Sequence, residues 1–233
     1  MAKRRTKPPS RVFLISPANC SGRRARLMLS PRAGFELARQ LQSREGAPLG
    51  DVFSFVSGLY FRGKLAYARR FARPPDPVDP IAAGGVLVIT PNAGLRSADT
   101  LVTVESFQGF AAADVDVRNP QYRRPLEDAA RALLNAVGAE CEVVLLGSVA
   151  SGKYVDVLLP IFGRQLTFPI HFVGRGDMSR GGLMLRCVAA GLELDYVPVE
   201  GAVRHGARPP KLEPLKRSAY AAQPARSDSR RRR

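Results

Sequence analysis

The stretch that indicates the fold is "CEVVLLGSVASGKY" (residues 141–154). Its first half, 141–147, is a run of apolar and β-branched residues, and its second half is a loop of small residues and a lysine. A short apolar run bounded by turn residues is typical of a buried strand. Comparable runs predict four more strands, at residues 11–16, 51–57, 85–90 and 165–173.

Segments with helical spacing separate these runs. The clearest is 122–137, where one apolar stripe runs from Leu126 to Val137 and Gly138 supplies a stop. Further helices are predicted at 32–44, at 62–72 and at 180–190, the last capped by Ser179 and ended by Gly191. Strands that alternate with helices predict a single α/β domain, residues 11–201, with a central mostly parallel or mixed sheet flanked by helices.

Composition limits the class of protein. A chain of 233 residues with 45% apolar residues fits one sizeable domain. No apolar run reaches the roughly 18 residues of a membrane span, and no signal peptide follows the basic N-terminus, so we expect a cytoplasmic location and no membrane partner. Three widely spaced cysteines and two histidines argue against a zinc ribbon, a disulfide framework or a metal site, and no cofactor is expected.

The net charge of +16 is concentrated at the two ends of the chain. Residues 1–10 carry four basic residues and no acid, and residues 202–233 carry ten basic and two acidic residues. Both segments have little apolar surface to bury, so we expect two disordered basic tails. Such tails either contact nucleic acid through its phosphates, without regard to sequence, or are simply solvated.

The loop at 147–154 resembles a phosphate-binding P-loop, because it spells G-x-x-x-x-G-K from Gly147. Tyr154 stands where a P-loop needs Ser or Thr to bind magnesium, and Pro160 leaves too few residues for the expected helix. No later apolar strand ends in the acidic magnesium partner. An NTPase is therefore the least favoured function, and Lys153 is predicted to be a simple phosphate contact.

Sites in parallel α/β sheets collect at the carboxyl ends of the strands. Five loops are expected there: "SPANCSGRR", "SGLYFRGK", "TPNAGLRSADT", "GSVASGKY" and "GRGDMSRGG". Each mixes small residues and hydroxyls with Arg or Lys, as a pocket for a phosphate or a nucleobase would. The alternative is ordinary turn chemistry. In the last loop, Arg175 and Arg180 beside a helix N-terminus suggest an anion site, unless Asp177 merely caps the helix.

The chain resembles the YaaA peroxide-stress proteins over about residues 11–190. The resemblance rests on the order of "FLISPANCSG", "GDVFSFVSGLYFRGK", "VLVITPNAGLRSADTL", "LLGSVASGKYVDVLLP" and "GRGDMSRGGLMLR". A related layout occurs in uncharacterised domains akin to the uracil-glycosylase-like domain of archaeal tRNA-guanine transglycosylases. Asn19 stands where the YaaA family has lysine. The resemblance implies a compact α/β fold, DNA binding and a role in limiting oxidative damage, and it singles out Ser16, Pro17, Asp51, Gly94, Leu95, Ser151, Tyr154, Met178, Ser179 and Arg180.

The favoured hypothesis is therefore a nucleic-acid-binding protein whose partner is DNA. Lys153, Arg175 and Arg180 would contact phosphates, Asn19 or Asn92 would read a base edge, and Tyr154 or Tyr60 would stack on a base. The full set of predicted binding residues is Ser16, Asn19, Arg23, Asn92, Ser148, Ser151, Lys153, Tyr154, Arg175, Ser179 and Arg180.

The alternative is an enzyme that acts on a nucleoside or a modified base, through glycosidase or base-transfer chemistry. This reaction needs a carboxylate at the pocket, and Asp51, Asp156 and Asp177 are the candidates. Each of them could equally well be a helix cap or a loop hydrogen-bond acceptor. The alternative therefore requires these carboxylates to lie together at the strand-end loops.

Overall fold

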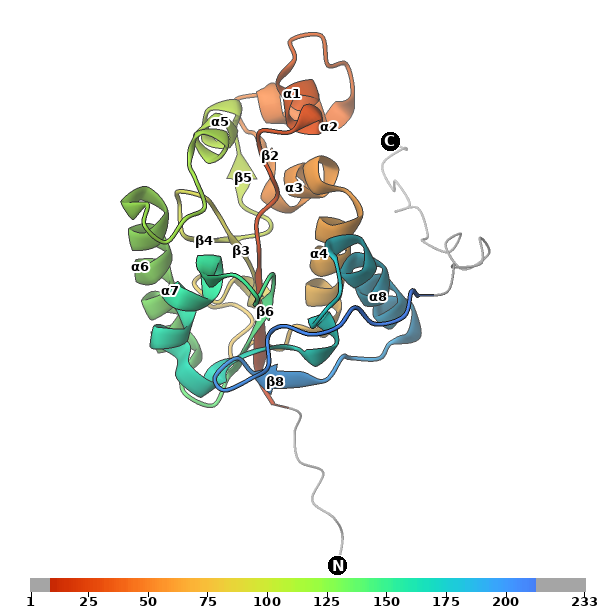
Figure 1. Cartoon of the computed structure of the whole chain (residues 1–233). Coiled ribbons are helices and arrows are strands. Elements are labelled where there is room, and N and C mark those ends of the chain that lie inside the picture. Colours follow the sequence, from red (N-terminus) through yellow and green to blue (C-terminus); the bar gives the residue numbers. More distant parts are fainter. Residues whose placement is uncertain (1–8, 213–233) are drawn as a thin grey trace, which may run out of the picture.

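The structure is a computed structural model, and it describes residues 9–212 (Figure 1). The two predicted disordered tails, 1–10 and 202–233, lie for most of their length outside these residues. Residues 202–212 contain no helix or strand, and they lie against the loop that precedes the last helix. There Arg175 Nη1 donates a hydrogen bond of 3.4 Å to the Pro210 carbonyl oxygen.

A six-stranded mixed sheet forms the centre of the molecule, in the order β4-β3-β1-β6-β7-β8. Four strands are parallel, namely β1 (Arg11–Ile15), β3 (Val86–Ile89), β6 (Glu142–Leu146) and β7 (Leu166–Pro169). The edge strands β4 (Leu95–Ser97) and β8 (Tyr196–Pro198) are antiparallel to their neighbours. The predicted α/β fold with a mostly parallel or mixed sheet is confirmed.

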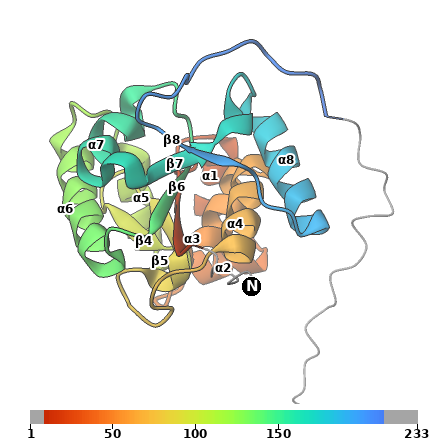
Figure 2. The ribbon, with the colours of Figure 1, turned by 90° about the horizontal axis from the view of Figure 1, so that it is seen from below.

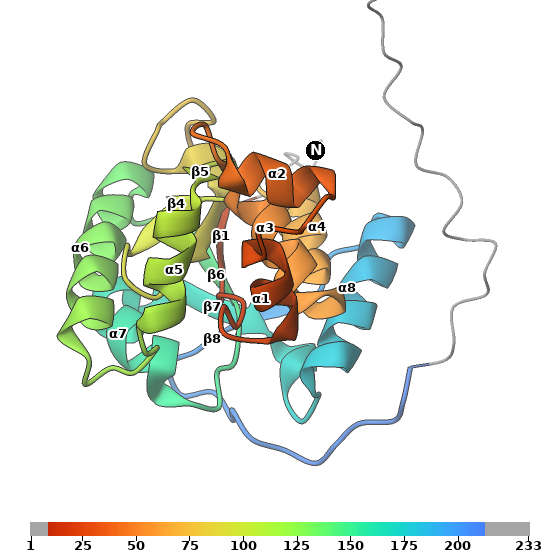
Figure 3. The same ribbon diagram turned by 90° about the horizontal axis from the view of Figure 1, so that it is seen from above.

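Helices cover both faces of the sheet, as the views along it show (Figures 2 and 3). On one face lie α1 (Arg23–Leu29), α2 (Glu36–Gln42), α3 (Leu49–Ser57), α4 (Leu59–Phe71) and α8 (Asp177–Ala190). On the other face lie α6 (Pro120–Val137) and α7 (Gly152–Phe162). The helix α5 (Val104–Ala112) packs against α3 near the carboxyl edge, and the short strands β2 (Ala47–Pro48) and β5 (Leu101–Val102) pair beside it.

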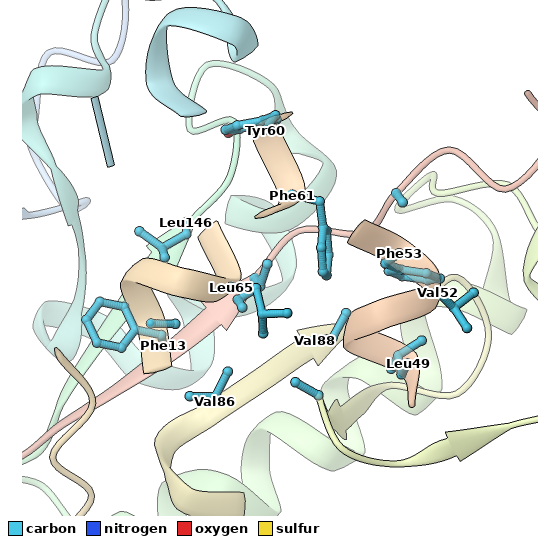
Figure 4. Packing of buried hydrophobic residues seen from close by; sticks show 14 of the residues in the cluster. Phe13, Leu49, Val52, Phe53, Tyr60, Phe61, Leu65, Val86, Val88 and Leu146 are labelled. Atoms are coloured by element: carbon cyan, nitrogen blue, oxygen red, sulfur yellow. The ribbon is translucent and has the colours of Figure 1, made fainter. Parts of the chain in front are cut away.

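Because helices cover both faces, the central strands are apolar at nearly every position. In β1, Phe13 and Ile15 belong to the core beneath α3, α4 and α8, whereas Val12 and Leu14 belong to the core beneath α6 and α7. Figure 4 shows Phe13 beside Leu65 of α4, with Val86 and Val88 of β3 in the same layer. The continuous apolar runs in the sequence are therefore the signature of strands buried on both sides.

The predicted strand at 51–57 is wrong, because these residues belong to the helix α3. Leu49, Val52 and Phe53 are buried, a spacing of three and four residues that places them on one face of a helix. Taken alone, the Val and Phe residues of "DVFSFVS" are typical of a strand. When Leu49 is included, the buried positions have the spacing of a helix. The loop "SGLYFRGK" therefore follows a helix, and most of it forms the start of α4.

The expectation that Pro160 prevents a helix after Lys153 is also wrong. The helix α7 runs from Gly152 to Phe162 with Pro160 inside it. A proline removes the hydrogen bond to the carbonyl four residues earlier, here that of Asp156. Both residues are exposed, so water can solvate the free carbonyl, and only two further helical residues follow the proline.

The remaining elements differ from their predictions mainly at their boundaries. The predicted helix at 122–137 begins at Pro120, and the one at 62–72 begins at Leu59. The last helix begins at Asp177 with Gly176 as its N-cap, so Ser179 lies inside it and is not the cap; it ends at Gly191 as predicted. The predicted strand at 165–173 is shorter, because a 3-10 turn, η3 (Ile170–Phe172), follows β7.

Candidate functional site

A cavity of about 510 Å³ opens at the carboxyl edge of the parallel strands. Within the sheet, β3 lies next to β1 on one side, and β6, which follows β3 in the chain, lies next to β1 on the other side. The loops that follow β1 and β6 therefore diverge, and this is the point where open α/β sheets bind ligands. Figure 3 looks onto this edge. The cavity is lined by Ser16, Pro17, Ala18, Asn19, Cys20, Ser21, Ser57, Tyr60, Pro91, Phe110, Ala111, Ala113, Asp114, Val115, Ser148, Lys153, Tyr154 and Asp177.

The structure brings six of the predicted site residues together in this lining. They come from the loop after β1, the loop after β6 with the first turn of α7, and the first turn of α8: Ser16, Asn19, Ser148, Lys153, Tyr154 and Asp177. Tyr60, which was expected to stack on a base, also lines the cavity, although it lies on α4 rather than in a strand-end loop. The lining draws on all five predicted loops, because Ser57 and Tyr60 belong to "SGLYFRGK" and Pro91 belongs to "TPNAGLRSADT".

Other predicted residues lie near the cavity or away from it, outside the lining. Arg23 is exposed at the start of α1, directly after the loop that borders the cavity. Asn92 follows the lining residue Pro91, and Ser151 is the N-cap residue of α7. Asp51 and Asp156 are exposed on α3 and α7.

The loop before α8 forms a different feature from the predicted anion site. Arg175 and Ser179 line a separate surface groove of about 320 Å³ together with Arg208 and Lys211. Arg180 is buried, and its Nε and Nη2 donate hydrogen bonds of 3.2 and 2.9 Å to the Phe172 carbonyl oxygen. Arg180 therefore holds the end of η3 against α8.

The carboxylates required by glycosidase chemistry are only partly present. Of the three candidates, Asp177 alone lines the cavity. A second lining carboxylate, Asp114, follows α5 and was not expected from the sequence. Loop carboxylates of this kind have no sequence signal, because Asp is common in turns.

The junction of β6 and α7 does have the strand-loop-helix order of a P-loop. The side chain of Tyr154, however, is buried, and burial raises its pKa, while the nearby Ser16 side chain opposes this shift. A phenol held against Ser16 cannot take the place of the magnesium-binding hydroxyl of a P-loop. The geometry therefore supplies the helix of a P-loop but not its magnesium-binding hydroxyl.

The most unusual group at the site is Lys64 of α4, which was not among the residues predicted from the sequence. Its side chain is 1% exposed, and its Nζ donates hydrogen bonds of 2.6 Å to the Ser16 carbonyl oxygen and 2.7 Å to Ser16 Oγ. Within residues 9–212 it forms no ion pair, and its Nζ lies over the rings of Tyr60 and Phe61, 4.4 and 5.1 Å from their centroids. A buried cation without a carboxylate partner is rare.

Burial lowers the pKa of Lys64 to about 7. The carboxylate of Asp177 opposes this shift and the guanidinium of Arg180 adds to it. A large part of Lys64 is therefore a neutral amine near neutral pH. The sequence signal was the position of Lys64 four residues after Tyr60, on the helix face that also carries Phe61, Leu65 and Ala68.

Tyr60 carries a hydroxyl that is buried and has no hydrogen-bond partner in the described part of the chain. Burial raises its pKa to about 12, against the opposing effect of the Arg180 guanidinium, so the phenol stays protonated and remains a donor. A buried donor without a partner is rare in folded proteins.

Removing this hydroxyl should therefore cost no stability. We expect Tyr60→Phe to leave the free energy of unfolding unchanged or to raise it by up to about 1 kcal/mol, because no hydrogen bond is lost. The matched control is Tyr122→Phe, since Tyr122 is also a buried tyrosine but its Oη donates to the Lys153 carbonyl oxygen at 2.8 Å. This control should lose about 1 kcal/mol in urea unfolding. Equal losses in both variants would show that Tyr60 has a partner after all.

A second hollow, of about 600 Å³ and more open, lies at the amino edge of the sheet. Its charged residues Arg11, Glu142 and Glu193 form ion pairs, and its lining also includes Thr167, whose buried hydroxyl has no hydrogen-bond partner in the described residues. The carboxyl-edge cavity differs in two ways, because it lies where the loops after β1 and β6 diverge and it adjoins the buried Lys64. We therefore place the functional site at the carboxyl edge.

Comparison with models of known protein families, with curated proteins and with solved structures found no match. Among residues 9–212, no helix has the length and hydropathy of a membrane span. The same residues contain no cluster of His, Cys, Asp and Glu suited to a metal ion. The three cysteines are free thiols, and burial raises the pKa of Cys20, in the cavity lining, to about 12.

Proposed function

We propose that the protein binds nucleic acid in the manner expected of a YaaA-like protein, and that the carboxyl-edge cavity receives one base of the bound strand. The observation that carries this proposal is the position of the cavity at the point where the loops after β1 and β6 diverge. Its volume of about 510 Å³ lies within the range of small-molecule sites.

The lining is better suited to a base than to a phosphate. It offers one cation, Lys153, and two carboxylates, Asp114 and Asp177, of which Asp177 is paired with the buried Arg180 at 3.7 Å, so the lining has no excess of positive charge to hold a doubly charged phosphate. Amide and hydroxyl groups of Asn19, Ser21 and Ser148 provide donors and acceptors for a base edge, and the largely buried rings of Tyr60 and Phe110 add aromatic surface to the lining.

Phosphates of the same strand would be contacted at the rim of the cavity. Lys153 is exposed there, and α1, which begins directly after the lining loop, presents the exposed Arg23, Arg24 and Arg26. Contacts of this kind supply affinity without sequence preference. The proposed partner is DNA, in line with the family resemblance and its implied role in limiting oxidative damage.

Binding of fluorescent single-stranded DNA, followed by anisotropy over a series of salt concentrations, tests the phosphate contacts. We expect Lys153→Ala to weaken binding several-fold for every sequence and to reduce the salt slope by about 1. The matched control is Arg164→Ala, which removes an exposed cation in the hollow at the amino edge. Equal effects of the two substitutions would contradict a role of the carboxyl edge.

A second comparison tests the base site. An oligonucleotide with bases should bind at least about tenfold more tightly than an abasic one of the same length, because stacking contributes about 1–3 kcal/mol per base. Equal affinity would show that only the phosphates are bound.

A further inference from the structure

Ser16 and Lys64 form a buried hydroxyl-amine pair at the end of the central strand. Ser16 is anchored in the sheet, since its backbone N–H donates a 3.1 Å hydrogen bond to the Leu146 carbonyl oxygen. Ser16 belongs to the cavity lining and Lys64 does not, and Lys64 Nζ lies 2.7 Å from Ser16 Oγ. Ser16 therefore links the cavity to the amine.

The surroundings of Lys64 favour its neutral form. The charged and titratable groups that face it are Asp177 and Arg180 from α8, and Tyr60 on its own helix. None of them forms an ion pair with it in the described residues. As a neutral amine, Lys64 can donate one N–H to the Ser16 carbonyl oxygen and accept the Oγ proton with its lone pair, so both observed contacts are satisfied without a charge.

We propose that Ser16 is the nucleophile of an acyl-transfer or acyl-hydrolysis reaction and that Lys64 is its general base. Serine-lysine pairs are an established variant of the nucleophile-base arrangement, which requires hydrogen-bond contact between the two groups. A site with this pair goes beyond nucleic-acid binding, because it performs covalent chemistry on a carbonyl carbon.

The reaction balances with the groups at hand. As Ser16 Oγ bonds to the carbonyl carbon of an ester, its proton passes to Lys64 Nζ. The bond from that carbon to the leaving oxygen breaks, and the Lys64 ammonium returns the proton to the departing alcohol. Water then attacks the acyl-Ser16 ester, giving a proton to Lys64, and the carboxylic acid leaves as Oγ regains a proton. Nothing is oxidised or reduced.

Two phenols lie where they could stabilise the oxyanion of the tetrahedral intermediate. Tyr60 and Tyr154 both belong to the cavity lining, the buried Tyr60 hydroxyl has no hydrogen-bond partner in the described residues, and Tyr154 interacts with Ser16. Neutral donors suit the single negative charge of such an intermediate. Phosphoryl transfer needs several cations around the reacting group, and the cavity lining contains only Lys153 among the described residues.

Together with the base-sized cavity, this chemistry points to an acyl group carried by a nucleoside or nucleotide as the substrate. This part of the inference rests on the proposed function, whereas the Ser16 nucleophile does not. Lys153 at the rim would contact an anionic group of the substrate.

Labelling of the full-length protein with a fluorophosphonate probe tests the nucleophile. Mass spectrometry should find one adduct, on Ser16, that is lost in Ser16→Ala and retained in the control Ser43→Ala, which removes a hydroxyl at the end of α2. The labelling rate should rise with pH around a midpoint near 7, the pKa of Lys64. In Lys64→Met the rate should fall at least about 100-fold and lose this midpoint.

Because Lys64→Met changes a buried position, Ser16→Cys provides a second readout. Alkylation of its thiol by iodoacetamide should be faster at pH 7 than that of Cys20 or Cys187 in the same chain, since the amine can take the thiol proton. Two labelling results would overturn the proposal: an adduct on a different serine, or no adduct under conditions that label a reference serine hydrolase. Unchanged labelling in a folded Lys64→Met variant, or an unreactive thiol in Ser16→Cys, would overturn it as well.

The substrate class has its own test. Hydrolysis of an O-acetyl nucleoside is compared with that of the O-acetyl sugar that lacks the base. Faster hydrolysis of the O-acetyl nucleoside supports a nucleoside or nucleotide ester as the substrate, and equal rates refute this substrate class. The assignment of Ser16 as the nucleophile is tested separately, by the labelling experiment.

Discussion

Gly63→Ala and Gly181→Ala are each expected to destabilise the protein by about 2–3 kcal/mol, the cost of overpacking a tightly packed interface. The two glycines face each other where α4 and α8 lie side by side (Figures 2 and 3). A Cβ on Gly63 would lie 2.7 Å from the Gly181 carbonyl oxygen, and a Cβ on Gly181 would lie 2.9 Å from the Leu59 carbonyl oxygen. Both clashes involve backbone atoms, so only a separation of the helices can relieve them.

The neighbouring Gly182 provides the control for this prediction. A Cβ there would meet only Leu212 Cδ1, at an ordinary contact distance of 3.7 Å. Gly182→Ala should therefore keep the stability or raise it by up to about 1 kcal/mol, because alanine is the better helix former. Urea unfolding of the three variants measures the difference. A loss in Gly182→Ala as large as in Gly181→Ala would mean that helix geometry, rather than the contact between α4 and α8, sets the cost.

The same contact positions the candidate site. The helix α4 carries Tyr60 and Lys64, and α8 carries Asp177 and Arg180. Separating the helices would admit water to Lys64 and return its pKa toward that of an exposed lysine. The Ser16 labelling rate in any folded Gly63→Ala protein should accordingly lose its midpoint near pH 7, whereas Gly182→Ala should keep it.

The strands of the sheet were well predicted from the sequence where they are buried on both faces. In β1, β3 and β6 every residue except Arg11 and Glu142 is apolar, and few structures other than a strand covered on both sides produce so continuous a pattern. The prediction failed at 51–57, because a short run of Val and Phe fits either a strand or one side of a helix. The difference depends on Leu49, which lay outside the run and completes the helical spacing.

The site residues in the strand-end loops could be predicted from the sequence, whereas Lys64, on a helix, could not. Strand-end loops reveal themselves by their small and polar residues, and Ser16, Asn19, Ser148 and Lys153 were found in this way. The helical spacing places Lys64 on the apolar face of α4, but a lysine there often carries its charge to the surface, and only the packing of α4 against α8 and β1 shows that the amine itself is buried. Burial of a charge depends on contacts between segments far apart in the chain, here those of Ser16 and Lys64, which no local pattern encodes.

The free energy of unfolding should rise by roughly 2 kcal/mol between pH 7 and pH 8.5 in the wild type relative to Lys64→Met. The pKa of Lys64 is lowered from 10.5 to about 7 in the folded protein. Between these values the unfolded chain binds a proton at Lys64 and the folded chain does not, so stability increases with pH. Urea unfolding of both proteins at several pH values in this window gives the difference.

The comparison with Lys64→Met removes the other contributions to the pH dependence. The raised pKa values of the buried cysteines and tyrosines favour the opposite trend at high pH, but both proteins share them. Lys64→Met also loses the hydrogen bond to the Ser16 carbonyl oxygen, which lowers its free energy of unfolding. This loss does not increase between pH 7 and pH 8.5, so it does not produce the expected slope. Parallel curves would mean that Lys64 remains charged in the folded protein, and a charged amine has no lone pair with which to accept the Ser16 proton. The stability measurement thus tests, without any substrate, the protonation state on which the Ser16 nucleophile depends.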